Sequence, residues 1–382
     1  MCLTGLFCYC DGHKKGWCIM IYIPMLKTRD EELRVLRSMK EHYSDKIIPL
    51  IEVICEKYQV RYMLDENGEF IKEKHKTQYR RVKCKPTEQD IITLQSLNEM
   101  VEGHKLFIDY FRFSLNKYGK NIKFKSAELA FNLSNDYQLY KQKVLGVAQY
   151  RNMVPVISVK PEFDIPKNEL KSFVAQLQST AEQMALRITE EWIDVYKDII
   201  CGLLRHDDFL LFDIGEQNPE SKFMELEELN DLGAKCNIVL LNSPRKTSVR
   251  NGEYPEHDKT DLINNCARNI ASAYDLTGYG DYCGLRDVMP LNNKSNGTGA
   301  ALALLYDFTQ NVFYSYCNHD TSLGTKGYLD IIPLIIGDEA ILNSDGDCPG
   351  YMKIKQLPST GSWNTWHHIN AIRYIHQTSK HL

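Results

Sequence analysis

The sequence lacks any apolar run long enough to cross a bilayer. A membrane-spanning helix needs ~18 or more consecutive apolar residues, whereas the longest runs here are short pieces such as "IMIYIPML" at 19–26. The sequence therefore predicts a soluble protein with no membrane among its partners.

Cysteine pairs of the zinc-binding type are also absent. The chain has 12 cysteines, scattered from Cys2 to Cys348, and none forms a CxxC pair with zinc-ribbon spacing. This distribution is typical of reduced, mostly buried thiols and predicts a cytoplasmic protein.

The first 19 residues, "MCLTGLFCYCDGHKKGWCI", hold four of the cysteines. They have neither the basic start nor the long apolar stretch of a signal peptide. We interpret 1–19 as an irregular leader, or as an upstream extension of a chain that begins at Met20. A small metal-binding knuckle is the alternative, although the CYC spacing is poor for tetrahedral zinc.

The chain has little net charge. Hydrophobic residues make up 43%, charged residues 25%, and the net charge is -4, which is the composition of an ordinary soluble protein. An anionic partner must therefore meet a local patch, and two segments offer one. Residues 72–85 carry seven basic residues and one acid, and residues 112–125 carry five basic residues and no acid.

Aromatic residues lie between these charges, so both segments could bind the phosphates and bases of a nucleotide or nucleic acid. We expect the two segments to lie on the same face of the molecule. A solvated loop surface is the commoner explanation for such charge runs.

No glycine-rich turn follows the first apolar run, which argues against an open dinucleotide-binding sheet. Instead, eight short apolar runs alternate with mostly helical text, at 21–26, 46–53, 105–111, 154–159, 184–188, 209–215, 237–243 and 280–285. Such strands joined by helices indicate a parallel sheet that is covered by helices. Their number and span match a (β/α)8 barrel. We therefore predict an α/β fold, with a TIM-like barrel over residues 20–290.

Two additions to a minimal barrel are expected. An insertion at 56–103 should contain a β-hairpin around "DENG" (65–68), because such a turn between alternating stretches favours a hairpin. After residue 290, "NNKSNGTG" predicts a loop, "ALALLYDFTQNVFYSYC" a hairpin, and "GYLDIIPLIIG" a buried helix or strand. We expect 291–382 to form an α+β extension that packs on the barrel.

Charged residues end the predicted strands, where the chemistry of α/β barrels lies. The candidate catalytic acids are Glu52, Asp109, Asp213 and Asp281, and the candidate ligand-binding cations are Lys27 and Arg187, with Lys160 and Arg286 at two further strand ends. Together they could supply a general acid and base, or hold a divalent cation against a phosphate. Any single one could equally neutralise a neighbour.

The stretch "WNTWHHINAIRYIH" at 363–376 carries two adjacent histidines, His367 and His368. On a helix they point ~100° apart, and no HExxH spacing is present. The aromatic and isoleucine spacing favours a core-capping helix over a metal site. One histidine could still face the barrel mouth, so both are candidate ligand-binding residues.

Several stretches together resemble the Beta protein family of phages and prophages. They are "YIPMLKTRDEELRVL" with "IIPLIEV", the "VPVISV" and "LLFDIG" strands, "YGDYCGLRDV", and the closing "WNTWHHI". The resemblance implies a phage or mobile-element accessory protein linked to toxicity suppression or phage exclusion, with no established reaction or cofactor. The matching positions are Lys27, Glu52, Asp213, Tyr279, Asp281, His367 and His368.

Two hypotheses follow. In the first, the protein acts in the bacterial cytoplasm mainly through contacts with a protein partner, and the barrel is a scaffold. In the second, it is a barrel enzyme that acts on a nucleotide or nucleic-acid phosphate through the strand-end carboxylates, with a divalent cation as a candidate cofactor. The sequence leaves open whether the protein is an enzyme, because barrels host unrelated functions.

Overall fold

The computed structural model describes residues 20–260, 267–292 and 298–382. The predicted leader 1–19 and most of the loop at "NNKSNGTG" lie outside the described residues. Within those three ranges, no helix combines the length and apolar content that crossing a membrane requires.

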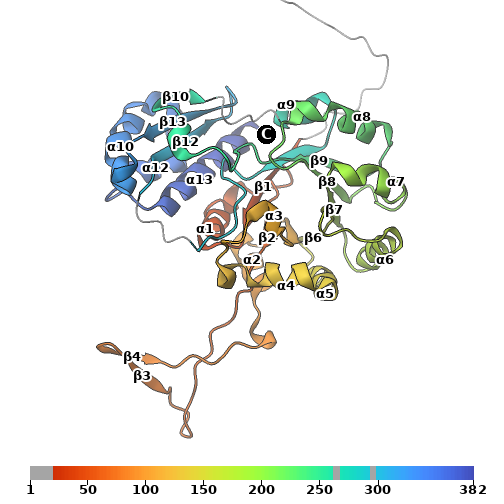
Figure 1. Cartoon of the computed structure of the whole chain (residues 1–382), viewed down its shortest axis with the longest axis horizontal. Coiled ribbons are helices and arrows are strands. Elements are labelled where there is room, and N and C mark those ends of the chain that lie inside the picture. The colour runs from red at the N-terminus through yellow and green to blue at the C-terminus, as the bar shows by residue number, and fades with distance from the viewer. Residues whose placement is uncertain (1–19, 261–266, 293–297) are drawn as a thin grey trace, which may run out of the picture.

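Eight parallel strands form a closed barrel (Figure 1). Strand β11 pairs with β1 and so closes the ring. The barrel strands are β1 (Ile21–Lys27), β2 (Leu50–Val53), β5 (Leu106–Tyr110), β6 (Met153–Ser158), β7 (Ala185–Ile188), β8 (Phe209–Asp213), β9 (Asn237–Leu241) and β11 (Gly278–Asp281). Each corresponds to one of the eight predicted runs, so the predicted α/β barrel is confirmed.

Helices lie outside the strands (Figure 1). They are α1 (Asp30–Ser38), α2 (Thr93–Val101), α3 (Leu115–Tyr118), α4 (Glu128–Asn135), α5 (Tyr137–Val147), α6 (Lys167–Gln178), α7 (Ile193–Gly202), α8 (Phe223–Asp231) and α9 (Ala267–Ala273). Helix α1 shows the local logic, because Val35 and Leu36 are buried while three acids occupy its first turn. Negative charge there is favourable to the helix dipole.

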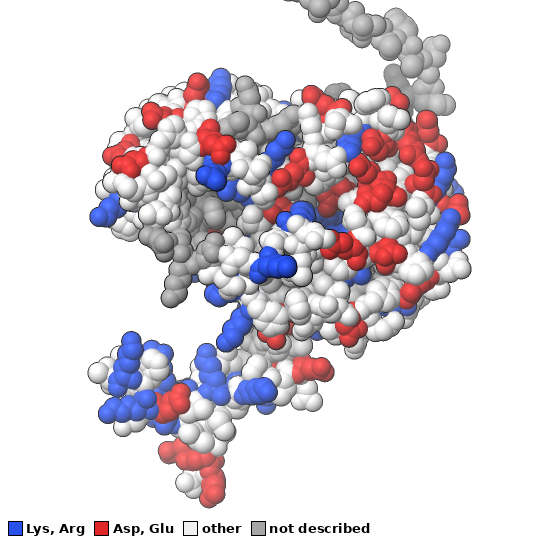
Figure 2. All heavy atoms as spheres, viewed as in Figure 1, with Lys and Arg blue, Asp and Glu red and all other residues white. Residues whose placement is uncertain are grey.

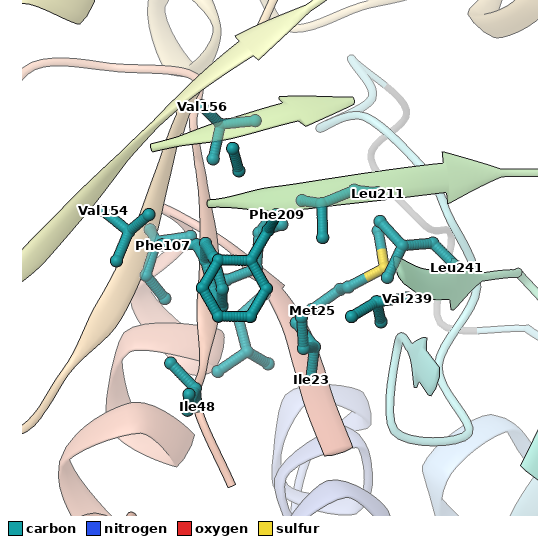
Figure 3. Packing of buried hydrophobic residues seen from close by; sticks show 14 of the residues in the cluster. Ile23, Met25, Ile48, Phe107, Val154, Val156, Phe209, Leu211, Val239 and Leu241 are labelled. Atoms are coloured by element: carbon teal, nitrogen blue, oxygen red, sulfur yellow. The ribbon is translucent and has the colours of Figure 1, made fainter. Parts of the chain in front are cut away.

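Alternate residues of each strand fill the barrel interior, because successive side chains of a strand point to opposite faces. Figure 3 shows this packing, with Met25, Phe107, Phe209 and Leu211 among the labelled side chains. Phe107 on β5 and Phe209 on β8 come from strands that are not neighbours, yet their ring centroids lie 4.9 Å apart. At this level the interior is therefore filled by packed side chains.

The insertion after β2 is an arm that projects from the barrel (Figure 1). It contains the hairpin of β3 (Lys72–His75) and β4 (Gln78–Arg81). The predicted turn at 65–68 is also present. It closes a second, shorter hairpin, in which Leu64 forms a bridge with Phe70. Helix α2, although within the predicted insertion 56–103, is the barrel's own crossover helix between β2 and β5.

The C-terminal region contains β12 (Ala301–Asp307) and β13 (Val312–Asn318), paired antiparallel as predicted. Strand β10 (His257–Thr260), from the segment between β9 and β11, adds to β13. The sequence does not predict β10, because "HDKT" has none of the apolar alternation of a strand. The remaining helices are α10 (Tyr328–Gly337), α11 (Glu339–Leu342), α12 (Pro349–Lys355) and α13 (Trp363–His381).

Helix α13 joins this sheet to the barrel, since it packs on β12, α12 and α1. Ile369, Ile372 and Ile375 are buried, and Trp366 stacks on Tyr328 with ring centroids 4.2 Å apart. This packing supports the predicted core-capping role of residues 363–376.

Candidate active site at the barrel mouth

A pocket of about 830 Å³ opens at the carboxyl ends of the barrel strands. Its lining comes from loops that follow six of the eight strands and includes Phe111, Lys160, Arg187, Asp213 and Arg286. A volume of this size suits a small organic ligand, for which pockets typically span about 300–1,000 Å³.

Below the pocket lies a buried network of charges centred on Arg187. The guanidinium Nη1 donates to Glu52 Oε1 and to Asp109 Oδ2, both at 2.7 Å. Its Nη2 and Nε donate to Asp213 Oδ2 at 2.6 and 2.9 Å. Glu52 and Asp109 are fully buried, so one arginine joins three of the four predicted acids.

A second cation completes the network. Lys27 Nζ donates to Glu52 Oε2 and to Asp287 Oδ1, both at 2.6 Å. Asp287 also accepts from Lys117 Nζ at 2.6 Å and from the Tyr118 hydroxyl at 2.9 Å. Buried charges are stable when they are paired and hydrogen-bonded in this way.

The pairing determines the charge states. Burial alone would raise the pKa of Glu52, but Lys27 and Arg187 lower it below its usual value. Burial would likewise lower the pKa of Lys27, but Asp287 and Glu52 raise it. Both groups therefore stay charged at neutral pH, and neither is poised to exchange a proton.

Lys160 differs from these groups because no carboxylate in the described portion of the chain pairs with it. Its Nζ donates only to the Arg112 carbonyl oxygen, at 3.3 Å, and lies 3.8 Å from the centroid of the Phe111 ring. Burial, and then the positive charge of Arg187, lower its pKa to about 8. It is thus the pocket amine whose protonation changes near physiological pH.

Strand alternation explains where the predicted residues lie. Lys27 is two residues from Met25 and Asp109 is two from Phe107, so both continue the interior face. By the same parity Tyr282, two residues beyond Gly280, faces the mouth and donates to Glu52 Oε1 at 2.9 Å.

Asp281 has the opposite parity and lies away from the mouth. It accepts from the hydroxyls of Tyr22 and Tyr374 at 2.9 and 2.5 Å, between the barrel wall and α13. Tyr279, another family-matching position, shares this outward parity. The structure therefore does not bring Asp281 together with the other predicted acids.

The two histidines separate as their helical geometry predicts. His368 is buried against α1, with Nδ1 3.2 Å from Glu31 Oε1 and Nε2 3.5 Å from Ser38 Oγ. Burial lowers the pKa of His368 to about 4 and that of His367 to about 3. Across the described ranges, no three His, Cys, Asp or Glu side chains converge in a way that could hold a metal ion.

Asp287, Lys117 and Tyr282 join the site although the sequence did not single them out. Lys117 belongs to the predicted basic segment 112–125. Tyr282 could have been found from strand alternation, because it lies two and four residues after the interior-facing glycines Gly280 and Gly278 of β11. Asp287 lies in an irregular loop, where no periodic signal specifies its direction.

A closed parallel barrel with a pocket of charged and apolar side chains at the carboxyl ends of its strands defines an α/β-barrel protein with the architecture that barrel enzymes share. The chain belongs to the Beta protein family, whose family model matches residues 22–380. This confirms the resemblance of the sequence and, with it, the coarse expectation of a phage-type protein.

No curated protein matches the sequence. Among solved structures, the crystal structure of dihydropteroate synthase from Anaplasma phagocytophilum with bound 6-hydroxymethylpterin-monophosphate is 12% identical. The match covers 69% of this chain and 93% of that chain, with a TM-score of 0.29. At that TM-score the similarity carries no argument about the ligand.

Proposed function

We propose that this protein binds a small phosphorylated ligand, of nucleotide size, in the barrel mouth and acts on it as an enzyme, with Lys160 as the proton-transferring group. The observation that carries the proposal is the pocket of about 830 Å³ that holds this amine without a carboxylate partner. A general base works best when its pKa is near the working pH. Lysines acquire such values by burial beside other cations.

The lining supports an anionic ligand with a ring. Lys160 and Arg286 offer positive charge, and Phe163 offers aromatic surface. Carboxylates such as Glu162, Glu190 and Glu216 also line the pocket, so the positive charge is local to these two cations. Phosphates pair with the cations and rings stack on the aromatic surface. In this proposal the carboxylates Glu52, Asp109 and Asp213 are not the acid, the base or metal ligands. They hold Arg187 and Lys27 in place beneath the ligand.

Calorimetric titration with mononucleotides and other phosphorylated metabolites tests this proposal. Lys160→Met should weaken binding of the best ligand at least about ten-fold, because a charge-assisted hydrogen bond contributes about 1.5–3 kcal/mol. Wild-type affinity should also fall as pH rises through about 8, where Lys160 loses its charge.

The matched control is Lys123→Met, since Lys123 is exposed and does not line the pocket. Equal affinities of wild type and Lys160→Met, or no ligand among the compounds tested, would contradict the proposal.

A second function is supported by the projecting arm. We propose that the arm binds a protein partner with an acidic surface in the bacterial cytoplasm, and that this contact serves toxicity suppression or phage exclusion. Figure 2 shows lysine and arginine gathered on its β3–β4 hairpin, and acidic residues at its far tip. On the arm Leu64, Phe70 and Tyr79 are 54%, 42% and 71% exposed, and exposed apolar side chains rimmed by charge are typical of contact surfaces.

The arm and the pocket are separate surfaces. The hairpin lies well away from α3 in Figure 1, and none of residues 72–85 lines the pocket, whereas Arg112 and Lys117 do. The two basic segments, expected on one face, thus do not form a single patch. Nucleic acid remains the alternative partner of the arm.

A further inference from the structure

Two arginines lie together where the barrel meets the C-terminal region. Arg245 is in the loop after β9 and Arg286 in the loop after β11. An Nη2 atom of each donates to the same oxygen, Asn251 Oδ1, at 3.1 and 3.2 Å respectively. Arg245 is only 4% exposed and Arg286 is half-buried, so one guanidinium group is buried beside another that is partly accessible.

No carboxylate in the described ranges neutralises either of them. Apart from Asn251, the acceptors are the carbonyl oxygens of Gly284, 3.4 Å from Arg245 Nη1, and of Val249, which accepts from Arg286. The Nε atoms of both arginines are buried without a partner. Burial, and then the charge of Arg286, lower the pKa of Arg245 to about 10.

The other groups that face the pair do not supply the missing charge. Arg29, which lies near His367, pairs with Glu32, 3.2 Å away. His367, from the first turns of α13, is neutral, since burial and the charges of Arg245 and Arg29 hold its pKa to about 3. Buried cations normally have a counter-charge, and here the described residues provide none.

The pair is reached from the barrel mouth. Arg286 lines the pocket, as does Thr247 from the same loop as Arg245. Strands β9 and β11 are the seventh and eighth of the barrel. As an analogy at the level of the fold, barrel enzymes frequently bind phosphate with the loops after their seventh and eighth strands.

We propose that Arg286, with Arg245 behind it, forms a phosphate-binding subsite of the pocket. Arg286 contacts the phosphate oxygens, because the planar guanidinium group matches phosphate geometry. Arg245 acts as a positioning residue that adds positive charge and holds Asn251 between them. The subsite also directs the rest of a bound ligand toward Lys160, a clause that rests on the proposed function.

Inorganic phosphate is the probe. We expect the melting temperature of the full chain to rise with phosphate concentration at constant ionic strength, relative to chloride, because a ligand that binds only the folded state stabilises it. Calorimetry should show at least ten-fold weaker phosphate binding for Arg286→Gln, which removes the guanidinium charge and keeps a polar side chain. Arg286→Lys should recover part of the loss, and Arg245→Met should weaken binding several-fold.

Lys246→Met, at an exposed position of the same loop, should bind phosphate as the wild type does. The phosphate titration uses no organic ligand and no substitution at Lys160, so failure of the enzymatic proposal and failure of this one are distinguishable. Wild-type protein that phosphate does not stabilise beyond the chloride control, or Arg286→Gln protein with wild-type phosphate affinity, would overturn the proposal. If Arg286→Gln does not fold, Arg286→Lys and Arg245→Met decide it, and unchanged affinity in both would overturn it.

Discussion

At the scale of single residues, the barrel mouth holds two kinds of charged group: those in ion pairs and those without an ion-pair partner among the described residues. Arg187 pairs with Glu52, Asp109 and Asp213, and Lys27 pairs with Glu52 and Asp287. Removing one partner of a buried pair typically costs about 3–5 kcal/mol. Lys160 has no such partner among the described residues. One pocket residue without an ion-pair partner is thus a lysine, whereas the sequence predicts carboxylates as the catalytic groups.

Asp281 gives a prediction about pH. Burial raises its pKa to about 6 despite the Tyr374 and Tyr22 hydroxyls. A carboxyl with a raised pKa in the folded state stabilises the protein when protonated, and that stability is lost as pH rises from about 4 to 6. Asp281→Asn, which carries no charge, should gain roughly 3 kcal/mol relative to the wild type between pH 4 and pH 7.

Urea unfolding at the two pH values measures this difference. Asp231→Asn, at an exposed helical position, controls for general charge effects. A difference between Asp281→Asn and wild type that does not change with pH would show that Asp281 titrates normally.

At the scale of elements, the arm is attached at two adjacent points of the barrel. Ile92 N donates to Lys57 O at 2.8 Å and Gln59 N donates to Asp90 O at 2.7 Å, so both ends of the insertion lie side by side. The hydrophobic core does not include the arm's hairpin. The arm should therefore be removable without loss of the barrel.

We predict that replacing residues 59–90 with a Gly-Ser linker leaves the melting temperature within a few degrees of the wild type. In a plating assay with a panel of phages, cells that carry the wild-type protein should be protected and those with the excised variant should not. The full-length variant with Arg80→Glu and Lys83→Glu should behave like the excised one, if charge directs the contact.

Lys160→Met serves as the matched variant in the same assay, because it alters the pocket and leaves the arm intact. The role of the arm would be contradicted if cells with the excised variant were still protected, or if cells with the wild-type protein were not protected. Protection that depends on Lys160 alone would favour the enzyme. Excised protein that binds oligonucleotides less tightly than wild type would instead assign a nucleic-acid partner to the arm.

At the scale of the whole molecule, α13 joins the barrel and the C-terminal region into a single cooperative unit. Trp366 packs in the C-terminal core, while Tyr374 on the same helix reaches Asp281 at the barrel wall. A helix shared by two cores couples their unfolding.

We predict a single unfolding transition, with coincident urea curves from circular dichroism and tryptophan fluorescence. Trp366→Ala should lower the unfolding free energy by about 3–5 kcal/mol and move that one transition as a whole. The exposed Asn364→Ala on the same helix is the control. Two separated transitions would show that the barrel and the C-terminal region unfold independently.

The architecture of the barrel was determined by the sequence itself. The eight apolar runs and their helices specify a parallel barrel because each strand must bury both faces. Period-two alternation also determines that Lys27, Glu52, Asp109, Arg187 and Asp213 face the interior and Asp281 does not. Strand alternation alone therefore separates Asp281 from the five residues whose side chains face the interior.

Only the tertiary structure decided which of these groups remain available. Pairing depends on contacts between residues far apart in the chain, as between Arg187 and Glu52, and no local pattern encodes those distances. The same holds for β10, whose polar "HDKT" becomes a strand through its hydrogen bonds to β13, and for Arg245 and Arg286, which Asn251 brings together. Local periodicity determines which face a side chain occupies, whereas its partners, and hence its chemistry, follow from how distant segments pack.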